Sequence, residues 1–233
     1  MQSRQNSGLV LAVLTMLSTS MPNAASAQQS EKIHVTTTAT LISDYRFRGV
    51  SLSDRKPALQ GGIDLERDGW FAGGWATTLG RQKDAGLEVD LRAGRKGQVA
   101  GLHYTIAGNV YLYPDLPDSR YVEIQTFVGK DIGRGQVTLE TSFAPKQNGL
   151  PFENIYIGMQ GDLPIAPAGL SLVARGGYED GFFRRKFDWE FGARYTKGPV
   201  TLMASIVGSS LGSRFAPRAD GRTGLLLSVS GSW

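Results

Sequence analysis

Apolar and polar residues alternate along most of this chain with a period of two. Two alternating segments follow each other within residues 38–66, with a polar turn between them. Successive side chains of a strand point to opposite faces, so this period predicts strands rather than helices. The first segment places Ala39, Leu41, Tyr45 and Phe47 on one face and Thr38, Thr40, Asp44, Arg46 and Arg48 on the other. The second segment alternates Leu59, Ile63 and Leu65 with Gln60, Asp64 and Glu66.

Full charges, and not only hydroxyl groups, occupy the polar face of these two segments. A soluble sandwich tolerates such charges when that face is solvated. A transmembrane barrel requires a polar inner face, because its outside meets lipid and its inside meets water. No apolar run after residue 28 is long enough for a membrane helix. A membrane form of this chain would therefore have to be a barrel.

The same alternation recurs along the chain and predicts an all-β fold, a transmembrane antiparallel β-barrel of about 12 strands. After the first two strands, we expect strands at residues 70–79, 86–95, 99–113, 120–130, 136–144, 153–163, 170–179, 187–196, 200–207 and 223–233. In residues 70–79, we expect the larger side chains to face lipid and the small ones to face the lumen and leave room there. The expected lipid face holds Phe71, Trp75 and Leu79, and the expected lumen face holds Ala72, Gly74, Ala76 and Thr78.

The connections between the expected strands alternate in length. The short ones carry the Gly that tight hairpins require, and they are Arg67-Asp68-Gly69, Lys96-Gly97-Gln98, residues 131–135 and Lys197-Gly198-Pro199. The longer ones are residues 48–57, 113–119, 144–152, 178–186 and 209–222, and the proline-rich 162–169 is the exception to the alternation. Short periplasmic turns and long extracellular loops are typical of outer-membrane barrels. An even strand count also places both termini on the periplasmic side.

The N-terminus has the pattern of a secretory signal peptide. Arg4 precedes an apolar segment at residues 8–17, and Ala25-Ser26-Ala27 forms an A-x-A cleavage site. We therefore expect a signal peptide at residues 1–27 and one mature barrel domain at residues 28–233. A membrane anchor is the alternative, but the apolar run is too short to span a bilayer as a helix. The chain contains no Cys, which removes disulfides and thiolate metal sites.

One stretch resembles a known family. It comprises SDYRFRGVSLSDRKPALQGGIDLE at residues 43–66 and Gly69-Trp70-Phe71-Ala72-Gly73-Gly74-Trp75. This stretch resembles the TorF family of predicted porins, also catalogued as the Gcw_chp family. The close likeness covers residues 36–75, and the rest of the chain is similar only in style. The resemblance implies an outer-membrane barrel of a Gram-negative bacterium and implies no particular solute.

The C-terminus carries a second indication of a barrel. Leu225, Leu227 and Val229 alternate with polar or small residues up to the final Trp233. A last strand that ends in an aromatic residue resembles the assembly signal of outer-membrane barrels. We therefore expect the barrel-assembly machinery to be a partner of this strand. The alternative is a strand that is last in the chain by chance.

The expected inner faces give a set of candidate pore-lining residues. They are Asp44, Arg46, Asp64, Glu66, Glu88, Asp90, Arg92, Glu123, Glu140, Arg175, Asp188, Glu190 and Arg194. Acids outnumber bases among them, so an open lumen would favour cations, as rings of acidic side chains do in cation pores. The alternative is that these charges pair across the lumen and fill it. A barrel of twelve strands lies between the filled eight-stranded and the open sixteen-stranded cases, so both alternatives stay open.

Basic residues outnumber acids in the expected long loops. They are Arg48, Arg55, Lys56, Arg81, Lys83, Lys146, Arg184, Arg185, Lys186, Arg214, Arg218 and Arg222. One interpretation is a mouth that concentrates anionic solutes. The other is pairing with outer-membrane lipid and glycolipid, whose phosphates and carboxylates attract surface bases. We favour the second interpretation.

Enzyme signatures are weak in this sequence. Gly208-Ser209-Ser210-Leu211-Gly212 matches G-x-S-x-G, but the helix that this motif needs after the turn is not predicted. His103 could activate a Ser, as in membrane phospholipases built on a barrel, yet no Ser is near it in sequence. His34 and His103 are too far apart in sequence to indicate a zinc site. We expect no catalytic residues, no metal and no cofactor.

These observations together predict a porin in the cell outer membrane, for passive diffusion of small hydrophilic solutes with a selectivity set by charged lumen residues. The first alternative is a non-conducting structural or surface-binding barrel, and a distant one is a barrel-embedded hydrolase. The formal net charge of +4 is too small to indicate a nucleic-acid partner.

Overall fold

The computed structural model describes residues 32–80, 85–116, 119–147, 150–165, 168–181, 185–211 and 221–233. The predicted signal peptide at residues 1–27 lies outside the described residues. Among the described residues, no helix is long and apolar enough to cross a membrane, a finding that concerns helical spans only.

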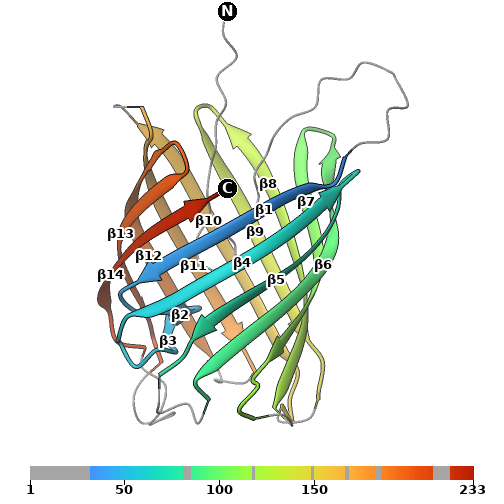
Figure 1. Ribbon diagram of the computed structural model, residues 1–233, viewed down its shortest axis with the longest axis vertical. Helices are drawn as coiled ribbons and strands as arrows, with labels where there is room; N and C mark the ends of the chain where they lie inside the picture. The colour runs from blue at the N-terminus through green and yellow to red at the C-terminus, as the bar shows by residue number, and fades with distance from the viewer. Residues whose placement is uncertain are drawn as a thin grey trace, which may run out of the picture.

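Twelve antiparallel strands form a closed barrel, which confirms the predicted fold class (Figure 1). In chain order the wall strands are β1 (His34–Ile42), β4 (Ala58–Arg67), β5 (Trp70–Thr78), β6 (Leu87–Val99), β7 (Leu102–Leu112), β8 (Arg120–Ile132), β9 (Gly135–Ala144), β10 (Asn154–Ile165), β11 (Leu170–Asp180), β12 (Lys186–Lys197), β13 (Val200–Ser209) and β14 (Gly224–Ser232). Each strand pairs with its neighbours in the sequence, and β1 pairs with β14 to close the wall.

The connections lie at two distinct ends of the barrel, which we call the turn end and the loop end. At the turn end, β4 and β5 are joined by Asp68 and Gly69, which both have positive φ. The predicted turn at Lys96-Gly97-Gln98 is wrong, because β6 continues to Val99 and the turn is Ala100-Gly101. Strand β1 begins and β14 ends at the turn end (Figure 1).

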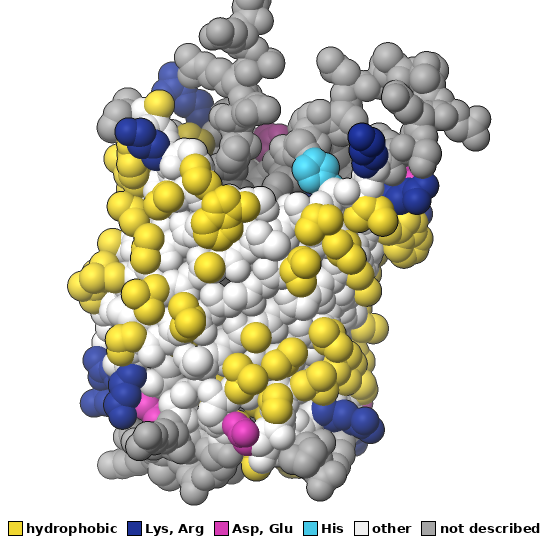
Figure 2. Space-filling view, in the orientation of Figure 1, with side chains coloured by type: hydrophobic (Ala, Val, Ile, Leu, Met, Phe, Trp, Pro, Cys, Tyr) yellow, Lys and Arg dark blue, Asp and Glu magenta, His cyan; other side chains and the backbone are white. Residues whose placement is uncertain are grey.

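The outer face of the wall is apolar. Large apolar side chains point outward from every wall strand, for example Leu59, Ile106, Ile157, Phe191 and Leu227. Figure 2 shows hydrophobic side chains spread over one face of the wall between its two ends, whereas the charged side chains in this view lie near the two ends. At the turn end, the guanidinium of Arg95 lies 5.2 Å from the ring centre of Trp70 on the same outer face. This distribution is the one expected for a wall in contact with lipid.

Strand β5 faces the opposite way from the sequence prediction. Phe71 pairs with Glu66 across the two-residue turn, and Trp75 pairs with Gly62. Directly opposite residues of an antiparallel pair point to the same side of the sheet, so Phe71 shares the inward face of Glu66. Trp75 likewise lies inside, 5.5 Å from the ring of Tyr45. The small residues of β5 that we expected in the lumen, Ala72, Gly74, Ala76 and Thr78, are therefore on the outer face.

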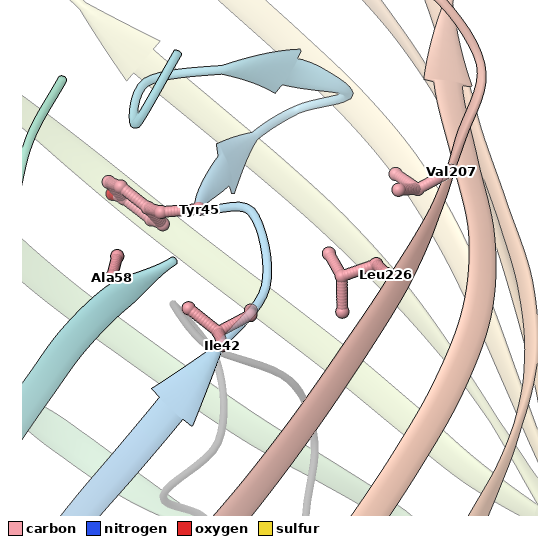
Figure 3. Close-up of a cluster of buried hydrophobic side chains, with 5 residues drawn as sticks. All are labelled: Ile42, Tyr45, Ala58, Val207 and Leu226. Atoms are coloured by element: carbon pink, nitrogen blue, oxygen red, sulfur yellow. The ribbon is translucent and has the colours of Figure 1, made fainter. Parts of the chain in front are cut away.

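The first wall strand is also shorter than predicted. Strand β1 ends at Ile42, and the chain then leaves the wall and enters the lumen. There it forms a small hairpin of β2 (Arg46–Phe47) and β3 (Val50–Ser51) (Figure 1). Tyr45, which the alternation places toward lipid, has no exposed surface and belongs to an internal apolar cluster (Figure 3). The other members of that cluster are Ile42, Ala58, Val207 and Leu226.

Gly94 on the inner face of β6 tests how tightly the lumen side is packed, and Gly108 on the outer face of the adjacent strand β7 serves as its comparison. A Cβ added at Gly94 would lie 2.1 Å from the carbonyl oxygen of Ile106, whereas a Cβ at Gly108 would meet no atom within 4 Å. Overpacking of this kind costs about 1–3 kcal/mol. We therefore expect Gly94→Ala to lower the urea midpoint, the concentration at which half of the refolded barrel is unfolded. The folded fraction is measured from gel mobility. Gly108→Ala is the control and should leave the midpoint close to that of the wild type, and equal midpoints for the two variants would contradict the packing described.

Candidate functional site

The candidate site is the segment that fills the lumen near the loop end, residues 43–57, which we call loop 1. Its side chains reach strands around the whole circumference. Tyr45 contacts Trp75 of β5, Phe47 contacts Tyr111 of β7, and Arg48 bonds to β8 and β11. Gly49 approaches the backbone of β13. Loop 1 therefore crosses the lumen instead of lying on one wall.

Four residues form the central contact of loop 1, and we call them the Arg48 cluster. The guanidinium of Arg48 donates to Glu123 of β8 at 3.0 Å and to Glu179 of β11 at 2.9 Å. The ammonium of Lys186 on β12 donates to the Arg48 carbonyl at 2.7 Å and pairs with Glu179 at 2.8 Å. All four side chains are at most 3% exposed. Two bases thus balance two acids in a water-poor part of the lumen.

The Arg48 side chain is also held from both faces. Its guanidinium carbon lies 4.5 Å from the ring centre of Phe47 and 4.3 Å from that of Tyr156. Burial lowers the pKa of Arg48, but Glu123 and Glu179 outweigh that effect and raise it above its ordinary value. Arg48 is therefore charged at every working pH and fixed by stacking as well as by ion pairs.

A second set of contacts joins the two arms of the hairpin to each other and to the wall. The Arg46 guanidinium donates to Asp44 at 2.6 Å and to the carbonyl of Arg222 at 2.7 Å. Asp44 also accepts from the hydroxyls of Ser51 and Ser53. The three side chains that donate to Asp44 all belong to loop 1. This set therefore gives the hairpin a defined shape before the wall is considered.

Gly49 lies at the tip of the hairpin, where the chain passes closest to the wall. It has φ of +77°, which favours glycine. A Cβ at this position would lie 2.3 Å from the carbonyl oxygen of Gly208 and 2.9 Å from Cβ of Asp188. Both the backbone conformation and the close approach therefore require glycine here, which explains the Arg-Gly step in the sequence of the loop.

At its start, loop 1 is connected to β6. The Tyr45 hydroxyl donates to Glu88 at 2.7 Å, and the Tyr45 ring packs against Trp75. Burial and the nearby carboxylate of Glu88 raise the pKa of Tyr45 well above its ordinary value, so the hydroxyl keeps its proton and remains a donor.

The half of the lumen nearer the turn end has separate ion pairs between wall strands. Arg92 of β6 bonds to both carboxylate oxygens of Asp64 on β4 at 2.7 Å. Lys96 pairs with Glu66 at 2.6 Å, and Arg194 pairs with Asp162. Gly73 lies between Asp64 and Arg92 in the sheet, and a Cβ there would collide with Asp64. The missing side chain thus lets Arg92 reach across one strand.

The predicted pore-lining residues all point to the inside of the barrel, but their burial differs. The buried ones are Asp44, Arg46, Glu88, Asp90, Glu123, Glu140, Asp188, Glu190 and Arg194. The partly exposed ones are Asp64, Glu66, Arg92 and Arg175. Asp44 and Arg46 are on loop 1 and not on a wall strand as predicted. Whether any of these residues lines an open pore stays a prediction.

Sequence reasoning missed several inward charges that the structure brings together. Glu179, Lys96 and Asp162 were not among the candidates, although alternation placed Glu179 on the inner face. Arg48 and Lys186 were predicted to be bases of the external loops, and this is wrong because both are buried inside the lumen. Arg81, Lys83, Arg184, Arg214 and Arg218 from the same prediction lie outside the described residues.

The residues considered for hydrolysis lie at opposite ends of the barrel. His103 is near the start of β7 at the turn end, where its ring nitrogens contact Gln98 and Asp131. Ser210 follows β13 at the loop end, and its hydroxyl accepts from the amide of Phe187. A nucleophile and its base must be within hydrogen-bond reach, so these two residues do not form a catalytic pair.

Comparison with solved structures shows that the fold is similar to that of porin β-barrels. A KdgM porin has a TM-score of 0.58 with 7% identity, covering 85% of this chain and 98% of that chain. The KdgM porin in complex with disordered oligogalacturonate has a TM-score of 0.59 with 7% identity and the same coverage. A structure from a study of in-meso crystallization of membrane proteins has a TM-score of 0.54 with 14% identity, covering 85% and 83%. At these identities the likeness concerns the fold alone.

The chain belongs to the family described as "Bacterial protein of unknown function (Gcw_chp)", which matches residues 26–218. This confirms the Gcw_chp part of the resemblance seen in the sequence, whereas the TorF name stays a prediction. No curated protein matches the sequence.

The Arg48 cluster generates a stability prediction. Replacing Arg48 with Met leaves Glu123 and Glu179 buried without their main partner, and breaking a buried pair in this way costs about 3–5 kcal/mol. We expect release of loop 1 to be the lowest-cost response, because the twelve wall strands pair with one another and not with loop 1. We expect Arg48→Met to expose Tyr45 and Phe47 to chymotrypsin in a barrel that still migrates as folded.

Arg185→Met is the matched control for this experiment. Arg185 pairs with Asp180, but its side chain is 80% exposed, and exposed pairs contribute about 0–1 kcal/mol. This variant should resist cleavage in loop 1 as the wild type does. Equal resistance of Arg48→Met would show that the cluster does not hold the loop.

Proposed function

We propose that this chain is an outer-membrane channel for passive diffusion of small hydrophilic solutes, and that loop 1 is its constriction. One observation carries the proposal: the closed wall is apolar outside and charged inside, the reverse of a soluble protein. Only a surface in contact with lipid stabilises such an exterior. The short turns would then face the periplasm and loop 1 would enter the lumen from the extracellular side.

Passage would be governed by size and by the charges next to loop 1. In the described lumen, acids still outnumber bases after the newly found residues are included. We therefore infer a preference for cations over anions, as in pores with acidic walls. The oligogalacturonate bound by KdgM porin carries carboxylates. An acidic lumen would repel such a ligand, so we do not propose it as a solute of this chain.

A specific observation favours a second candidate, a non-conducting structural barrel. The Arg48 cluster joins β8, β11 and β12 through loop 1 with four buried charged groups. Ion pairs of this kind would keep the lumen filled unless loop 1 moves. Conduction therefore separates the two candidates.

Three partners belong to the proposal. Outer-membrane lipid and glycolipid would contact the apolar wall and the exposed bases near the loop end, such as Lys56 and Arg185. The barrel-assembly machinery would bind β14. This strand carries the outward side chains of Leu225, Leu227 and Val229, and the exposed Trp233 follows it. Small hydrophilic solutes would cross the lumen without cofactor or turnover.

The first test is conductance of the refolded mature chain in a planar bilayer, with a salt gradient to read selectivity. We expect stable steps and a reversal potential of the sign for cations, because acids dominate the lumen. Folding is checked beforehand by the mobility difference between unheated and boiled samples. A folded barrel without steps would refute the channel and leave the structural barrel. Steps with anion preference would keep the channel and refute the acidic lumen as its filter.

Shortening loop 1 tests its role as the constriction. We expect replacement of residues 44–56 by a short Gly-Ser linker to increase the size of single conductance steps, because the hairpin and its buried side chains leave the lumen. The control is a Gly-Ser replacement of residues 114–119, a shorter segment between β7 and β8 that leaves Tyr113 in place, and it should leave the step size as in the wild type. If the shortened variant conducts in steps of wild-type size, loop 1 is not the narrowest part.

A further inference from the structure

Two neighbouring acids on β6 are in no salt bridge with the described residues, whereas Asp64 and Glu123 on nearby strands each pair with an arginine. Glu88 and Asp90 are two positions apart in a strand, so both side chains point into the lumen. Glu88 is 1% exposed and Asp90 is 8% exposed. They are on the wall beside the start of loop 1, where Tyr45 and Trp75 pack.

The bases in this part of the lumen are engaged elsewhere. Arg92, the next inward residue of β6, donates to both carboxylate oxygens of Asp64. Arg48 donates to Glu123 and Glu179 on the strands β8 and β11. No salt bridge of the described residues reaches Glu88 or Asp90. Two carboxyl groups are therefore adjacent, and no base of the described residues forms an ion pair with either of them.

A second observation concerns the carboxylate of Asp90, which has an oxygen without a donor among the described residues. Its Oδ1 atom is fully buried and accepts no hydrogen bond from the described residues. A buried carboxylate oxygen without a donor costs several kcal/mol and is compensated by a proton, a water or a cation. Glu88 differs, because the hydroxyls of Tyr45 and Tyr113 donate to it and fix its position.

The oxygen atoms gathered here fit a hard cation. Carboxylate and hydroxyl oxygens are the ligands that alkali and alkaline-earth cations take in proteins. Two carboxylates are fewer ligands than a permanent calcium site uses, and the described residues include no group of three or more acidic or histidine side chains that could hold a metal. Binding would therefore be weak, as conduction requires, because an ion must leave the site as readily as it enters.

We propose that Glu88 and Asp90 form a transient binding site for inorganic cations in the lumen beside loop 1. The inference rests on the proposed function, because a channel would bring cations to this wall. It assigns the cation selectivity of the proposed channel mainly to one pair of acids. Asp64 and Glu66, which the sequence grouped with this pair, are neutralised by Arg92 and Lys96 and contribute much less. Tyr45 joins the site to loop 1 through its bond to Glu88.

The test uses Tb³⁺ as the probe, since it binds carboxylates as Ca²⁺ does and emits when excited through a nearby tyrosine or tryptophan. Tyr45, Tyr113 and Trp75 surround the pair and serve as donors of excitation. We expect the folded wild-type barrel to give saturable Tb³⁺ emission that Ca²⁺ displaces. Asp90→Asn and Glu88→Gln should each raise the half-saturating Tb³⁺ concentration about tenfold or more, the effect of losing one charged ligand.

Glu66→Gln is the matched control, because it removes an inward acid that pairs with Lys96 near the turn end. It should leave the half-saturating concentration as in the wild type. Asp90→Asn removes a charge without a partner and is expected to fold as well as the wild type, so it keeps the test informative if Glu88→Gln does not fold. Absence of saturable emission from the wild type, or unchanged affinity in Asp90→Asn, would overturn the site and leave a proton or water on Asp90.

Reversal potentials separate this inference from the proposed function. If the barrel conducts, Asp90→Asn should reduce cation preference more than Glu66→Gln does, and an equal or smaller reduction would overturn the site. A barrel that binds Tb³⁺ at this pair but gives no conductance steps would support the site and refute the channel. A barrel that conducts with no binding would keep the channel and refute the site.

Discussion

Closure of the sheet is the constraint on which the rest of this structure depends. In hydrocarbon, every backbone amide and carbonyl must find a partner inside the protein, and a β-sheet achieves this only when its first and last strands pair. Here the pairing joins Thr38 to Ser232 and Ile42 to Ser228, and the amide of Trp233 donates to the carbonyl of Thr37. Once the wall is closed, successive side chains of each strand must face either the lipid or the lumen, so the polar side chains lie inside.

Because the wall takes the apolar side chains outward, the interior has to be stabilised by polar contacts instead of an apolar core. Loop 1 supplies much of that interior near the loop end, with one small apolar cluster around Tyr45 and several buried ion pairs. Gly49 lets the hairpin tip touch β13, and Gly73 lets Arg92 reach Asp64. These two glycines therefore determine where the charged groups can meet, although they carry no charge themselves.

The sequence predicted the wall well and the lumen poorly, for physical reasons. Period-two alternation fixes the face of each residue within a strand, so Glu88, Glu123 and Asp188 were correctly placed inside. The error in β5 was avoidable, because the Asp68-Gly69 turn fixes Phe71 opposite Glu66. The error in loop 1 was not, since alternation continues through Tyr45 and Phe47 after the chain has left the wall. The partners of Arg48 are Glu123 and Glu179, on strands distant in sequence, and no local pattern links them.

The energetics of the lumen indicate that its charges are there for more than stability. A buried ion pair is often no more stabilising than apolar residues of the same volume, because both groups lose their water. An inert plug could be built from side chains like those around Tyr45 and would fold at least as well. This chain instead keeps a charged hairpin inside the barrel and leaves Asp90 Oδ1 without a donor among the described residues. In the proposed channel, both features would face passing ions and water. The buried ion pairs of loop 1 also fit a structural barrel, so the unpaired Asp90 oxygen is the feature that favours the channel.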